Sequence, residues 1–401
     1  MTLANNTSTD GTALRIGLFG FGCVGQGLYD VLRRTPGLRA QVARICVKDR
    51  SKPRTLPLGM FTYDRGEILG DDTINVVVEL IDDANAAFDI VSSALRAGKA
   101  VVSANKRMIA ERFDDLLAIQ NETGSPFLYE ASVCGSIPII RNLEEYYDND
   151  LLDGLEGIVN GTTNFILTRV SDGEGAYEGA LASAQRLGFA ESDPTLDVEG
   201  YDAVFKTVIL AAHGFGVVVK PGNIVRRGIT TVSSFDADVA KRHGYTIKLV
   251  SSARLADGEV SASVLPTFVR DESPLASVRD EYNAVSLHAA FSDAQLMVGK
   301  GAGGHPTASA VLSDIAALRY AYRYEYKKIA QGLRPRFSQR VPIKIYARSS
   351  RRDLLEQIPW STIEIEHRSP DGSYVIGTTV LDELSASEAF RSDETFIAKV
   401  V

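Results

Sequence analysis

The sequence is poor in cysteine, in clustered positive charge and in long apolar runs. Its 401 residues include only three cysteines, Cys23, Cys46 and Cys134, without a CxxC pair, which argues for a reducing compartment and against a disulfide framework. The net charge is -8 and Lys and Arg form no block, which argues against a nucleic-acid partner. No apolar run is long enough to span a membrane, and the polar residues 1–13 lack the apolar core of a signal peptide. These absences predict a cytoplasmic protein with neither a membrane nor a nucleic acid as partner.

Histidine is also scarce, and the five histidines are too scattered to predict a metal site. The apolar fraction of 45% and the charged fraction of 23% are ordinary for a globular protein. The length allows two or three domains. Composition therefore predicts a globular protein, and any specific chemistry has to be inferred from motifs.

The clearest motif is a glycine-rich turn near the start of the chain. Residues 14–19 are predicted to form a short buried strand, and residues 26–33 have helical character. Between them stands a GxGxxG sequence, whose glycines allow a tight turn and the close approach of a pyrophosphate to the helix N-terminus. A plain strand-to-helix turn would also explain the glycines, but the order of elements favours dinucleotide binding. The predicted cofactor contacts are Gly20, Phe21, Gly22, Cys23, Val24 and Gly25.

The residues after the second predicted strand, 41–47, indicate which dinucleotide binds. They are Lys48, Asp49, Arg50, Lys52 and Arg54. NAD sites often have an acidic residue at the end of this strand, which holds the ribose hydroxyls. A cationic cluster stands here instead and favours the 2′-phosphate of NADP, although Asp49 could still serve NAD and a basic solvated loop is the plain alternative. Lys48 and Arg50 are the predicted contacts.

Two later strand ends carry candidate site residues. Residues 100–103 form a predicted strand, and Lys106 lies just past its carboxyl end, where ligands of open α/β sheets bind. Residues 126–129 form another predicted strand, which runs into Glu130 and a turn of small residues at 131–138. Carbonyls in that turn, beside Glu130, could coordinate a hard cation. A solvated lysine and a tight structural turn are the alternatives.

An acidic stretch at 188–206 precedes a predicted helix. Its carboxylates are Glu191, Asp193, Asp197, Glu199 and Asp202. If the helix begins near Gly200, Asp202 and Lys206 lie four residues apart on one face. A lysine held by a carboxylate can donate or accept a proton or clamp a substrate, and the other acids could hold an ammonium or a hydroxyl group. A solvated loop with a surface ion pair explains the same spacing.

The rest of the chain says less about chemistry. The polar residues 160–164, before an apolar helix start, are either a capping motif or a substrate-contact loop. Residues 217–300 are predicted to be mostly strands and loops, and a long helix is expected at 306–330. Residues 338–401 show the order β-α-β-β-α-β of a small ferredoxin-like module, with its second helix at 381–390.

Several stretches together resemble homoserine dehydrogenase, in family order from about residue 14 to residue 330. They are GLFGFGCVG (17–25), VVVEL (76–80), VVSANK (101–106), YEASV with GSIPII (129–140), GIVNGTTNFILT (157–168), GFAESDPTLDVEGYDAVFK (188–206) and GAGGHPTASAVLSDI (301–315). The stretches at 157–168 and 188–206 are highly specific to that family, whereas the glycine turn is not. The resemblance implies the interconversion of L-homoserine and L-aspartate 4-semialdehyde with NADP, or alternatively NAD, in threonine and methionine biosynthesis.

The resemblance also implies an α/β fold of three parts after the polar tail at 1–13. These parts are a Rossmann-type nucleotide-binding domain, a central α+β substrate and dimerisation domain, and a small ferredoxin-like (ACT-like) regulatory module. Their expected bounds are 14–150 rejoined by about 306–330, then 151–305, and then 338–401. A homodimer or a higher homo-oligomer is implied. Because the matched site residues all precede the ACT-like module, catalysis is expected not to depend on it.

Positions that match the family motifs imply roles for single residues. Lys206 is the implied acid-base group, Asp202 orients it, and Lys106 lies between cofactor and substrate. Glu191 and Asp197 match acids that hold the ammonium and hydroxyl groups of the substrate. The residues that match a monovalent cation site, expected to hold Na⁺ with three backbone carbonyls, are Glu130, Val133, Gly135 and Ile137.

One departure from the family and two other functions have to be weighed. Asp82 and Asp83 stand where the family usually has two glycines, and carboxylates there would repel a pyrophosphate. A semialdehyde dehydrogenase that uses the Cys134 thiol would need a partner histidine, and none neighbours Cys134 in the sequence. A catalytically inactive NAD(P)-binding regulator would be favoured if Lys206 or Asp202 were absent, and both are present.

Overall fold

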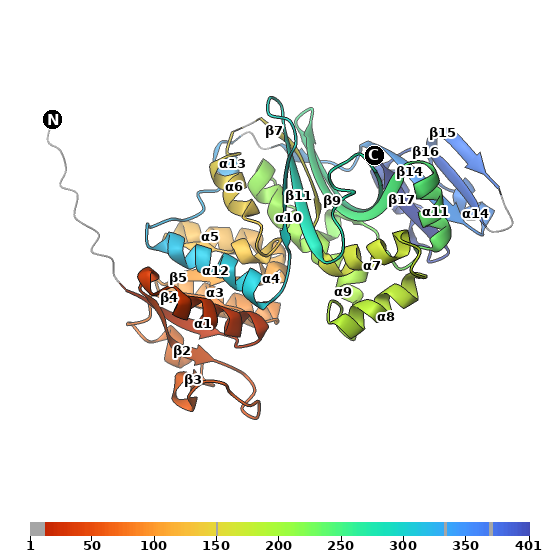
Figure 1. Ribbon diagram of the computed structural model, residues 1–401. Coiled ribbons are helices and arrows are strands. Elements are labelled where there is room, and N and C mark those ends of the chain that lie inside the picture. The colour runs from red at the N-terminus through yellow and green to blue at the C-terminus, as the bar shows by residue number, and fades with distance from the viewer. Residues whose placement is uncertain (1–12, 150, 333–334, 369–371) are drawn as a thin grey trace. The chain divides into compact units, whose positions relative to one another are not determined.

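The computed structural model describes residues 13–149, 151–332, 335–368 and 372–401 (Figure 1). The chain divides into two compact units. The first comprises the chain up to Met108, Arg112–Ser132 and Gly303–Tyr324, and the second comprises Ile109–Glu111, Val133–Ala302 and Glu325–Val401. The division after Ser132 differs from the boundary near residue 150 that the sequence predicts. The last strands belong to the second unit and do not form a unit of their own.

The first unit is built on a parallel six-stranded sheet with the order β3-β2-β1-β4-β5-β6. Its strands are β1 (Leu14–Phe19), β2 (Ala40–Cys46), β3 (Phe61–Thr62), β4 (Val76–Glu79), β5 (Ala100–Ser103) and β6 (Phe127–Leu128). Every residue of β4 is buried, so both faces of the sheet are covered there, as is usual for a parallel sheet. The strand order reverses between β1 and β4, and ligands of such sheets bind at the carboxyl ends next to that point.

Six helices accompany the parallel sheet in the described chain, and the first five of them lie between its strands. They are α1 (Cys23–Arg34), α2 (Gly66–Leu69), α3 (Ala84–Arg96), α4 (Lys106–Glu111), α5 (Phe113–Thr123) and α12 (Gly304–Leu318). Helix α12 comes from much later in the chain and packs against α1. The two backbones approach so closely that a Cβ on Gly27 would lie 2.6 Å from the Gly304 carbonyl oxygen. The chain thus returns to the first unit at Gly303–Tyr324.

Helix α12 is shorter than the sequence predicts. It ends at Leu318 and does not continue to Ala330, and a separate short helix, α13 (Lys327–Ala330), follows. Between the two helices, Ala321 and Tyr326 adopt left-handed backbone conformations, with φ of 55° and 47°. Left-handed residues cannot continue a right-handed helix. The prediction of one unbroken helix was wrong for this reason.

The second unit is built on an 11-stranded sheet whose main path is β12-β11-β7-β9-β10-β17-β14-β16-β15. Its strands are β7 (Leu152–Ile158), β8 (Val225–Arg226), β9 (Tyr245–Ala256), β10 (Glu259–Arg270), β11 (Tyr282–Ala289), β12 (Gln295–Lys300), β13 (Arg336–Phe337), β14 (Pro342–Ser349), β15 (Trp360–His367), β16 (Ser373–Val380) and β17 (Thr395–Val400). Its further helices are α6 (Ile139–Glu145), α7 (Gly161–Ser171), α8 (Tyr177–Leu187), α9 (Thr195–Val198), α10 (Tyr201–Phe215), α11 (Ser234–Arg242), α14 (Arg352–Glu356), α15 (Leu381–Ala386) and α16 (Glu388–Arg391). Helix α10 is buried from Asp202 to Phe215 and packs on β9 and β10, which agrees with its mostly apolar sequence. None of the described helices has the length and apolar character that crossing a membrane would require.

The C-terminal strands extend the sheet of the second unit. Strands β17, β14, β16 and β15 pair antiparallel in that order, and β17 also pairs in parallel with β10 through Thr267 and Phe268. Their order along the chain with α14, α15 and α16 is β-α-β-β-α-β. The helix expected at 381–390 is interrupted at Ser387, which is extended and accepts a hydrogen bond from the Phe390 N–H at 3.2 Å, so it caps α16.

Candidate functional site

The centre of the site in the second unit is an ion pair in the first turns of α10. Lys206 Nζ donates hydrogen bonds to Asp202 Oδ2 and to the Val159 carbonyl oxygen, both at 2.7 Å. Asp202 is 5% and Lys206 is 7% exposed. The i, i+4 spacing that the sequence suggested is thus a real contact, but it is buried and not a surface pair. Asp202 also lies at the helix N-terminus, where the helix dipole favours a carboxylate.

Asn160 joins this pair to a second carboxylate. Its Nδ2 donates to Asp202 Oδ2 at 2.9 Å and to Asp197 Oδ1 at 2.7 Å. Its Oδ1 accepts a hydrogen bond from the Thr163 N–H at 2.9 Å, so the same side chain caps α7. The capping alternative for residues 160–164 is therefore correct, and the cap also orients the two acids. The sequence indicated residues 160–164 as a cap or a substrate-contact loop, but it did not single out Asn160 as the link between the two acids.

Glu191 is placed differently from the other predicted acids. Its residue is exposed, and its backbone carbonyl accepts a hydrogen bond from Gln185 Nε2 at 3.1 Å. Within the described residues, no hydrogen bond or ion pair joins its carboxylate to Asp197, Asp202 or Lys206. The structure therefore brings together three of the four predicted substrate-site residues of this unit.

In the first unit, a buried carboxyl group is linked by hydrogen bonds to the residue before Lys106. Glu79, at the end of β4, is fully buried; its Oε2 accepts from Ser103 Oγ at 2.5 Å and its Oε1 from the Ile81 N–H at 2.7 Å. Burial raises the pKa of Glu79 to about 7, and the two hydrogen bonds oppose that rise only in part. Such a buried, hydrogen-bonded group at the carboxyl ends of β4 and β5 orders the backbone that follows.

Lys106 comes directly after residues that belong to this hydrogen-bond network. Ser103 Oγ accepts a hydrogen bond from the Asn105 N–H at 3.0 Å, and Asn105 Nδ2 donates to the Ile81 carbonyl at 2.9 Å. Asn105 Oδ1 caps α4 by accepting from the Met108 N–H at 2.9 Å. Lys106 is the first residue of α4 and is half-buried. Its backbone position is thus determined by a chain of hydrogen bonds that begins at Glu79.

The glycine turn lines a hollow of about 400 Å³ at the carboxyl ends of β1 and β2. Gly20 has φ +92°, and a Cβ there would lie 2.5 Å from the Leu80 carbonyl oxygen, so glycine is needed. The predicted contacts that line the hollow are Gly20, Phe21, Gly22 and Lys48. Cys23, Val24 and Gly25 form the first turn of α1, and this turn contains no acidic residue. An anionic group would therefore meet the N-terminus of α1 without a competing carboxylate from the first turn.

The cations around this hollow are only partly those predicted. Lys48, Lys52, Arg54 and Arg65 line it. Arg50 is not among the described residues that line it; its guanidinium lies over the Tyr63 ring at 4.4 Å. Sequence reasoning missed Arg65, which comes from the loop after β3 and has no sequence signal that connects it to β2.

The acids near the hollow are engaged in local turns. Asp49 Oδ1 accepts hydrogen bonds from the Ser51 N–H and hydroxyl at 2.8 and 2.7 Å, and the Ser51 hydroxyl foremost lowers the pKa of Asp49. Asp83 Oδ1 caps α3 by accepting from the N–H groups of Asn85 and Ala86 at 3.0 and 2.9 Å. The departure from the family at Asp83 therefore has a structural explanation, because the carboxylate is occupied as a helix cap.

The predicted cation residues are divided between the two units. Glu130, in the first, is 2% exposed, and its N–H donates to Asp314 Oδ2 at 2.9 Å. Val133, Gly135 and Ile137 lie in a tight turn of the second unit, in which Cys134 and Gly135 both have left-handed φ, 55° and 51°. All of these groups offer oxygen atoms, the ligand type that hard cations prefer.

One alternative function, a semialdehyde dehydrogenase that uses Cys134, finds no support in the geometry. The Cys134 side chain is fully buried, so it lacks the access that a thiol nucleophile needs. Among the described residues, no group of three or more His, Cys, Asp or Glu side chains is arranged to hold a metal ion.

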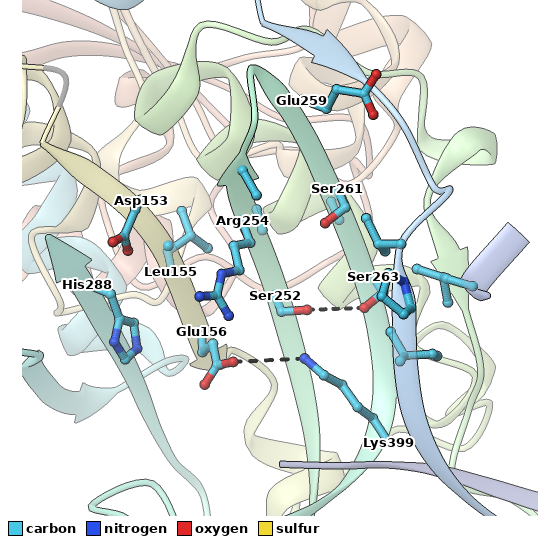
Figure 2. Close-up of a pocket in the computed structure, with 18 of the residues that line it drawn as sticks. Asp153, Leu155, Glu156, Ser252, Arg254, Glu259, Ser261, Ser263, His288 and Lys399 are labelled. Atoms are coloured by element: carbon cyan, nitrogen blue, oxygen red, sulfur yellow. Dashed lines mark hydrogen bonds and ion pairs between the residues drawn. The ribbon is translucent and has the colours of Figure 1, made fainter. Parts of the chain in front are cut away.

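A larger hollow, of about 890 Å³, lies on the sheet of the second unit and is lined by polar and apolar side chains, including residues of β7, β9 and β10 (Figure 2). Glu156 Oε1 lies 4.0 Å from Lys399 Nζ, and Ser252 Oγ lies 3.1 Å from Ser263 Oγ. Glu259 pairs with an arginine outside the hollow at 2.9 Å. The predicted site residues, all within the described chain, do not line it.

The chain matches two family models over most of its length. One is described as "Homoserine dehydrogenase, NAD binding domain" and matches residues 20–130; the other, "Homoserine dehydrogenase", matches residues 138–316. A homoserine dehydrogenase of Bacillus subtilis is 40% identical over 315 residues, which cover 76% of this chain and 73% of that protein. One of Corynebacterium glutamicum is 37% identical over 318 residues, 76% of this chain and 72% of that protein.

Solved structures give the same comparison. The crystal structure of a homoserine dehydrogenase from Thiobacillus denitrificans has a TM-score of 0.85 and 30% identity, and the match covers 97% of this chain and 98% of that one. A hyperthermophilic archaeal homoserine dehydrogenase in complex with NADPH has a TM-score of 0.66 and 26% identity, covering 78% of this chain and 99% of that one.

Proposed function

The chain belongs to the homoserine dehydrogenase family of NAD(P)-dependent oxidoreductases that act on a CH–OH group, and we propose that it interconverts L-homoserine and L-aspartate 4-semialdehyde with Lys206 as the acid-base group. The observation that carries this proposal is the buried Asp202–Lys206 pair, which Asn160 joins to Asp197. A desolvated lysine beside a carboxylate is a suitable group to donate or accept a proton.

The proton transfer follows from the position of Lys206. A bound nicotinamide supplies or accepts the hydride at the substrate's carbonyl carbon. In the reducing direction the Lys206 ammonium donates its proton to the aldehyde oxygen, which becomes the hydroxyl of the product. In the oxidising direction the neutral amine takes that proton back. Asp202 holds the amine in place, and Lys106, ordered through Glu79, is the second candidate to contact the same oxygen.

The substrate acids are proposed by charge and position. Asp197 lies next to the Asp202–Lys206 pair through Asn160, so it is placed to accept from an ammonium or a hydroxyl group. Glu191, exposed and without an ion pair in the described chain, is proposed to hold the substrate's ammonium group. Its assignment rests on the family resemblance alone.

We propose NADP as the preferred cofactor, bound in the first unit. Four cations line the hollow at the glycine turn, and Asp49, the residue that would hold the ribose of NAD, is engaged with Ser51. The four cations are Lys48, Lys52, Arg54 and Arg65. A 2′-phosphate would be favoured by them, whereas the ribose hydroxyls of NAD would leave them without an anion. Arg50 does not line the hollow, so it would affect the cofactor only indirectly, through its contact with the Tyr63 ring.

A monovalent cation, Na⁺, is proposed to bind Glu130 and the carbonyls of Val133, Gly135 and Ile137. One buried carboxylate with neutral carbonyls offers about one negative charge, which suits a monovalent ion better than Ca²⁺. The role of such an ion would be to hold the turn at Cys134 and Gly135, where two left-handed residues follow one another. No chemical step depends on it.

The remaining assignments are proposals from the family resemblance. The first unit is proposed to bind the dinucleotide and the second to bind the substrate and to form a homodimer. The C-terminal strands are proposed to be an ACT-like regulatory module, supported by their β-α-β-β-α-β order. We also propose a cytoplasmic location, supported by three cysteines that form no disulfide. Analytical ultracentrifugation would measure the oligomeric state.

One assay tests the proposed activity. The purified protein is incubated with L-homoserine and either NADP or NAD, without phosphate, and the reduced nicotinamide is followed by absorbance. We expect turnover with both nucleotides and a higher kcat/KM with NADP. A dependence on phosphate would favour the semialdehyde dehydrogenase alternative. No turnover with either nucleotide, in a protein that binds NADP, would favour the inactive regulator.

A further inference from the structure

Residues 226–230 run along the turn that carries the substrate acids. This turn, residues 197–202, is called the acid turn below. The Ile229 N–H donates to the Val198 carbonyl at 2.8 Å, and Thr230 Oγ1 donates to Glu199 Oε1 at 3.3 Å. A Cβ on Gly228 would lie 2.5 Å from the Val198 carbonyl oxygen, so only glycine allows this approach. The two segments are therefore packed backbone to backbone.

Arg226 makes the most extensive contact with the acid turn. Its guanidinium donates to the Glu199 carbonyl oxygen, lies 3.6 Å from Glu199 Oε2 and stacks on the Tyr201 ring at 3.7 Å. Gly200, between them, has φ +79°, and a Cβ there would lie 3.4 Å from Arg226 Cγ. Arg226 thus holds the residues immediately between Asp197 and Asp202.

The next residue, Arg227, points to the C-terminal strands. Its guanidinium donates to the carbonyl oxygens of Phe390, Ser392 and Thr395, the second of these at 2.8 Å. These carbonyls lie at the end of α16 and the start of β17. The side chain is buried, and no carboxylate in the described chain lies within ion-pair distance of it. Burial lowers the pKa of Arg227 to about 10.

The segment that carries both arginines is itself anchored. Val225 and Arg226 form β8, which pairs in parallel with Ser263 and Val264 of β10, and the Arg227 N–H donates to the Val264 carbonyl at 2.9 Å. A displacement of residues 390–395 would therefore move Arg227, and with it the short segment 225–227 that is hydrogen-bonded to β10. Arg226 and Arg227 are neighbours in the sequence and contact the acid turn and the C-terminal strands respectively, so no flexible loop lies between the two contacts.

We propose that Arg226 is a positioning residue for the substrate acids and that Arg227 couples its position to the C-terminal strands. The arrangement of residues 390–395 then affects how Asp197 and Asp202 are presented to the substrate. This inference rests on the proposed function, because it assigns the acid turn to substrate binding. It gives the C-terminal strands a physical route to the substrate site that needs no bound effector.

The test compares substrate binding with cofactor binding in the full chain. Arg226→Met and Arg227→Met should each raise KM for L-homoserine about fivefold to tenfold, the effect of losing roughly one charge-assisted hydrogen bond. The Kd for NADP, measured by fluorescence titration, should stay unchanged, because its proposed hollow is in the first unit. Arg352→Met, which removes an exposed i, i+4 pair of α14, is the matched control and should change neither quantity.

The double variant separates coupling from two independent effects. If Arg227 acts through Arg226, Arg226→Met/Arg227→Met should raise KM no more than the larger single change. Additive effects, or an unchanged KM in either single variant, would overturn the proposal. If Arg227→Met does not fold, Arg227→Lys replaces it, since lysine keeps the charge but lacks the planar fork that reaches three carbonyls.

A readout without turnover keeps this inference distinct from the proposed function. Amide hydrogen exchange of residues 198–204 should become faster in Arg227→Met than in the wild type and in Arg352→Met. Faster exchange in a protein that does not oxidise homoserine would leave the coupling intact and refute the function. Unchanged exchange in a protein that does oxidise homoserine would refute the coupling alone.

Discussion

Replacing Lys206 tests the central assignment, but the structure shows that the simple variant changes two properties at once. Lys206→Met removes the proposed proton donor and acceptor. It also removes the ammonium that neutralises Asp202, a carboxylate that is 5% exposed and lies at 2.7 Å. A loss of activity in this variant alone could therefore come from chemistry or from a disturbed site.

The two effects differ in magnitude and can be estimated separately. Losing a general acid-base group lowers kcat by about 10²-fold to 10⁴-fold. Removing one partner of a buried ion pair costs about 3–5 kcal/mol of unfolding free energy, because a charge stays buried without compensation. In Lys206→Met/Asp202→Asn the buried charge is removed as well, and the introduced amide keeps an oxygen that can accept from Asn160. We expect this double variant to regain most of the stability of the wild type and none of the activity.

The assay measures kcat for homoserine oxidation together with the midpoint of urea unfolding for the wild type and both variants. A matched control is Lys327→Met, which removes a half-buried lysine that pairs with Asp148 at 3.0 Å and should leave kcat unchanged. If kcat of Lys206→Met stays within tenfold of the wild type, Lys206 is not the acid-base group. If the double variant regains activity along with stability, the pair is structural and Lys106 becomes the first candidate.

Four further results are expected. Arg54→Ala should weaken NADP binding more than NAD binding, by about tenfold if one phosphate contact is lost, whereas equal weakening in fluorescence titrations would mean that no 2′-phosphate is read there. Glu79→Gln should flatten the stability profile between about pH 5 and pH 7. The folded-state pKa of Glu79 is raised from 4.5 to about 7, so the unfolding free energy of the wild type should fall by about 3 kcal/mol as the pH rises through this range. Parallel pH profiles of the unfolding free energy for the wild type and the variant, measured in urea, would contradict this expectation. Glu130→Gln should abolish any activation by NaCl over choline chloride, while an enzyme indifferent to both salts would refute the cation site. Deletion of residues 338–401 should lower the thermal unfolding midpoint and the solubility of the protein, and a truncated protein as stable as the full chain would refute the structural role of these strands.

What the sequence predicts correctly is mostly local. The strand, glycine turn and α1 follow one another within 21 residues, from Leu14 to Arg34, and each is specified by its own side chains. The Asp202–Lys206 pair follows from the helical period once the start of α10 at Gly200 is recognised. In both cases the signal and the structure lie on the same stretch of chain.

The errors arise where local signals are weak or overridden. The two left-handed residues that end the helical region after Leu318, Ala321 and Tyr326, are not glycines, so no sequence signal marks them. Helix α11 in the stretch expected to be strands and loops was missed, although Ser233 and Asp236 form a capping box that the sequence contains. The first error could not have been avoided from one sequence, whereas the second could.

Contacts between distant segments account for the rest. Asn160 joins Asp197 to Asp202, and Arg65 joins the cations after β2 in one hollow. Neither partner choice is encoded by spacing, because the residues come from different elements that only the folded sheet brings together. The candidate site was therefore predicted as a set of charges, and its geometry had to come from the structure.

The C-terminal strands show why sequence position is a poor guide to independence. They come after all the proposed site residues, which suggested a separable module, yet β17 pairs with β10 and Leu265 of β10 packs in the apolar cluster of β14 and β17. Arg348 of β14 also pairs with the buried Asp236 of α11 at 2.7 Å. Deleting these strands would expose that cluster, and it would remove the carbonyl groups to which Arg227 donates and the Tyr346 and Arg348 side chains that donate to Asp236. A truncation therefore cannot separate regulation from folding, whereas a single substitution at Arg227 removes the link to the acid turn without deleting any strand of the sheet.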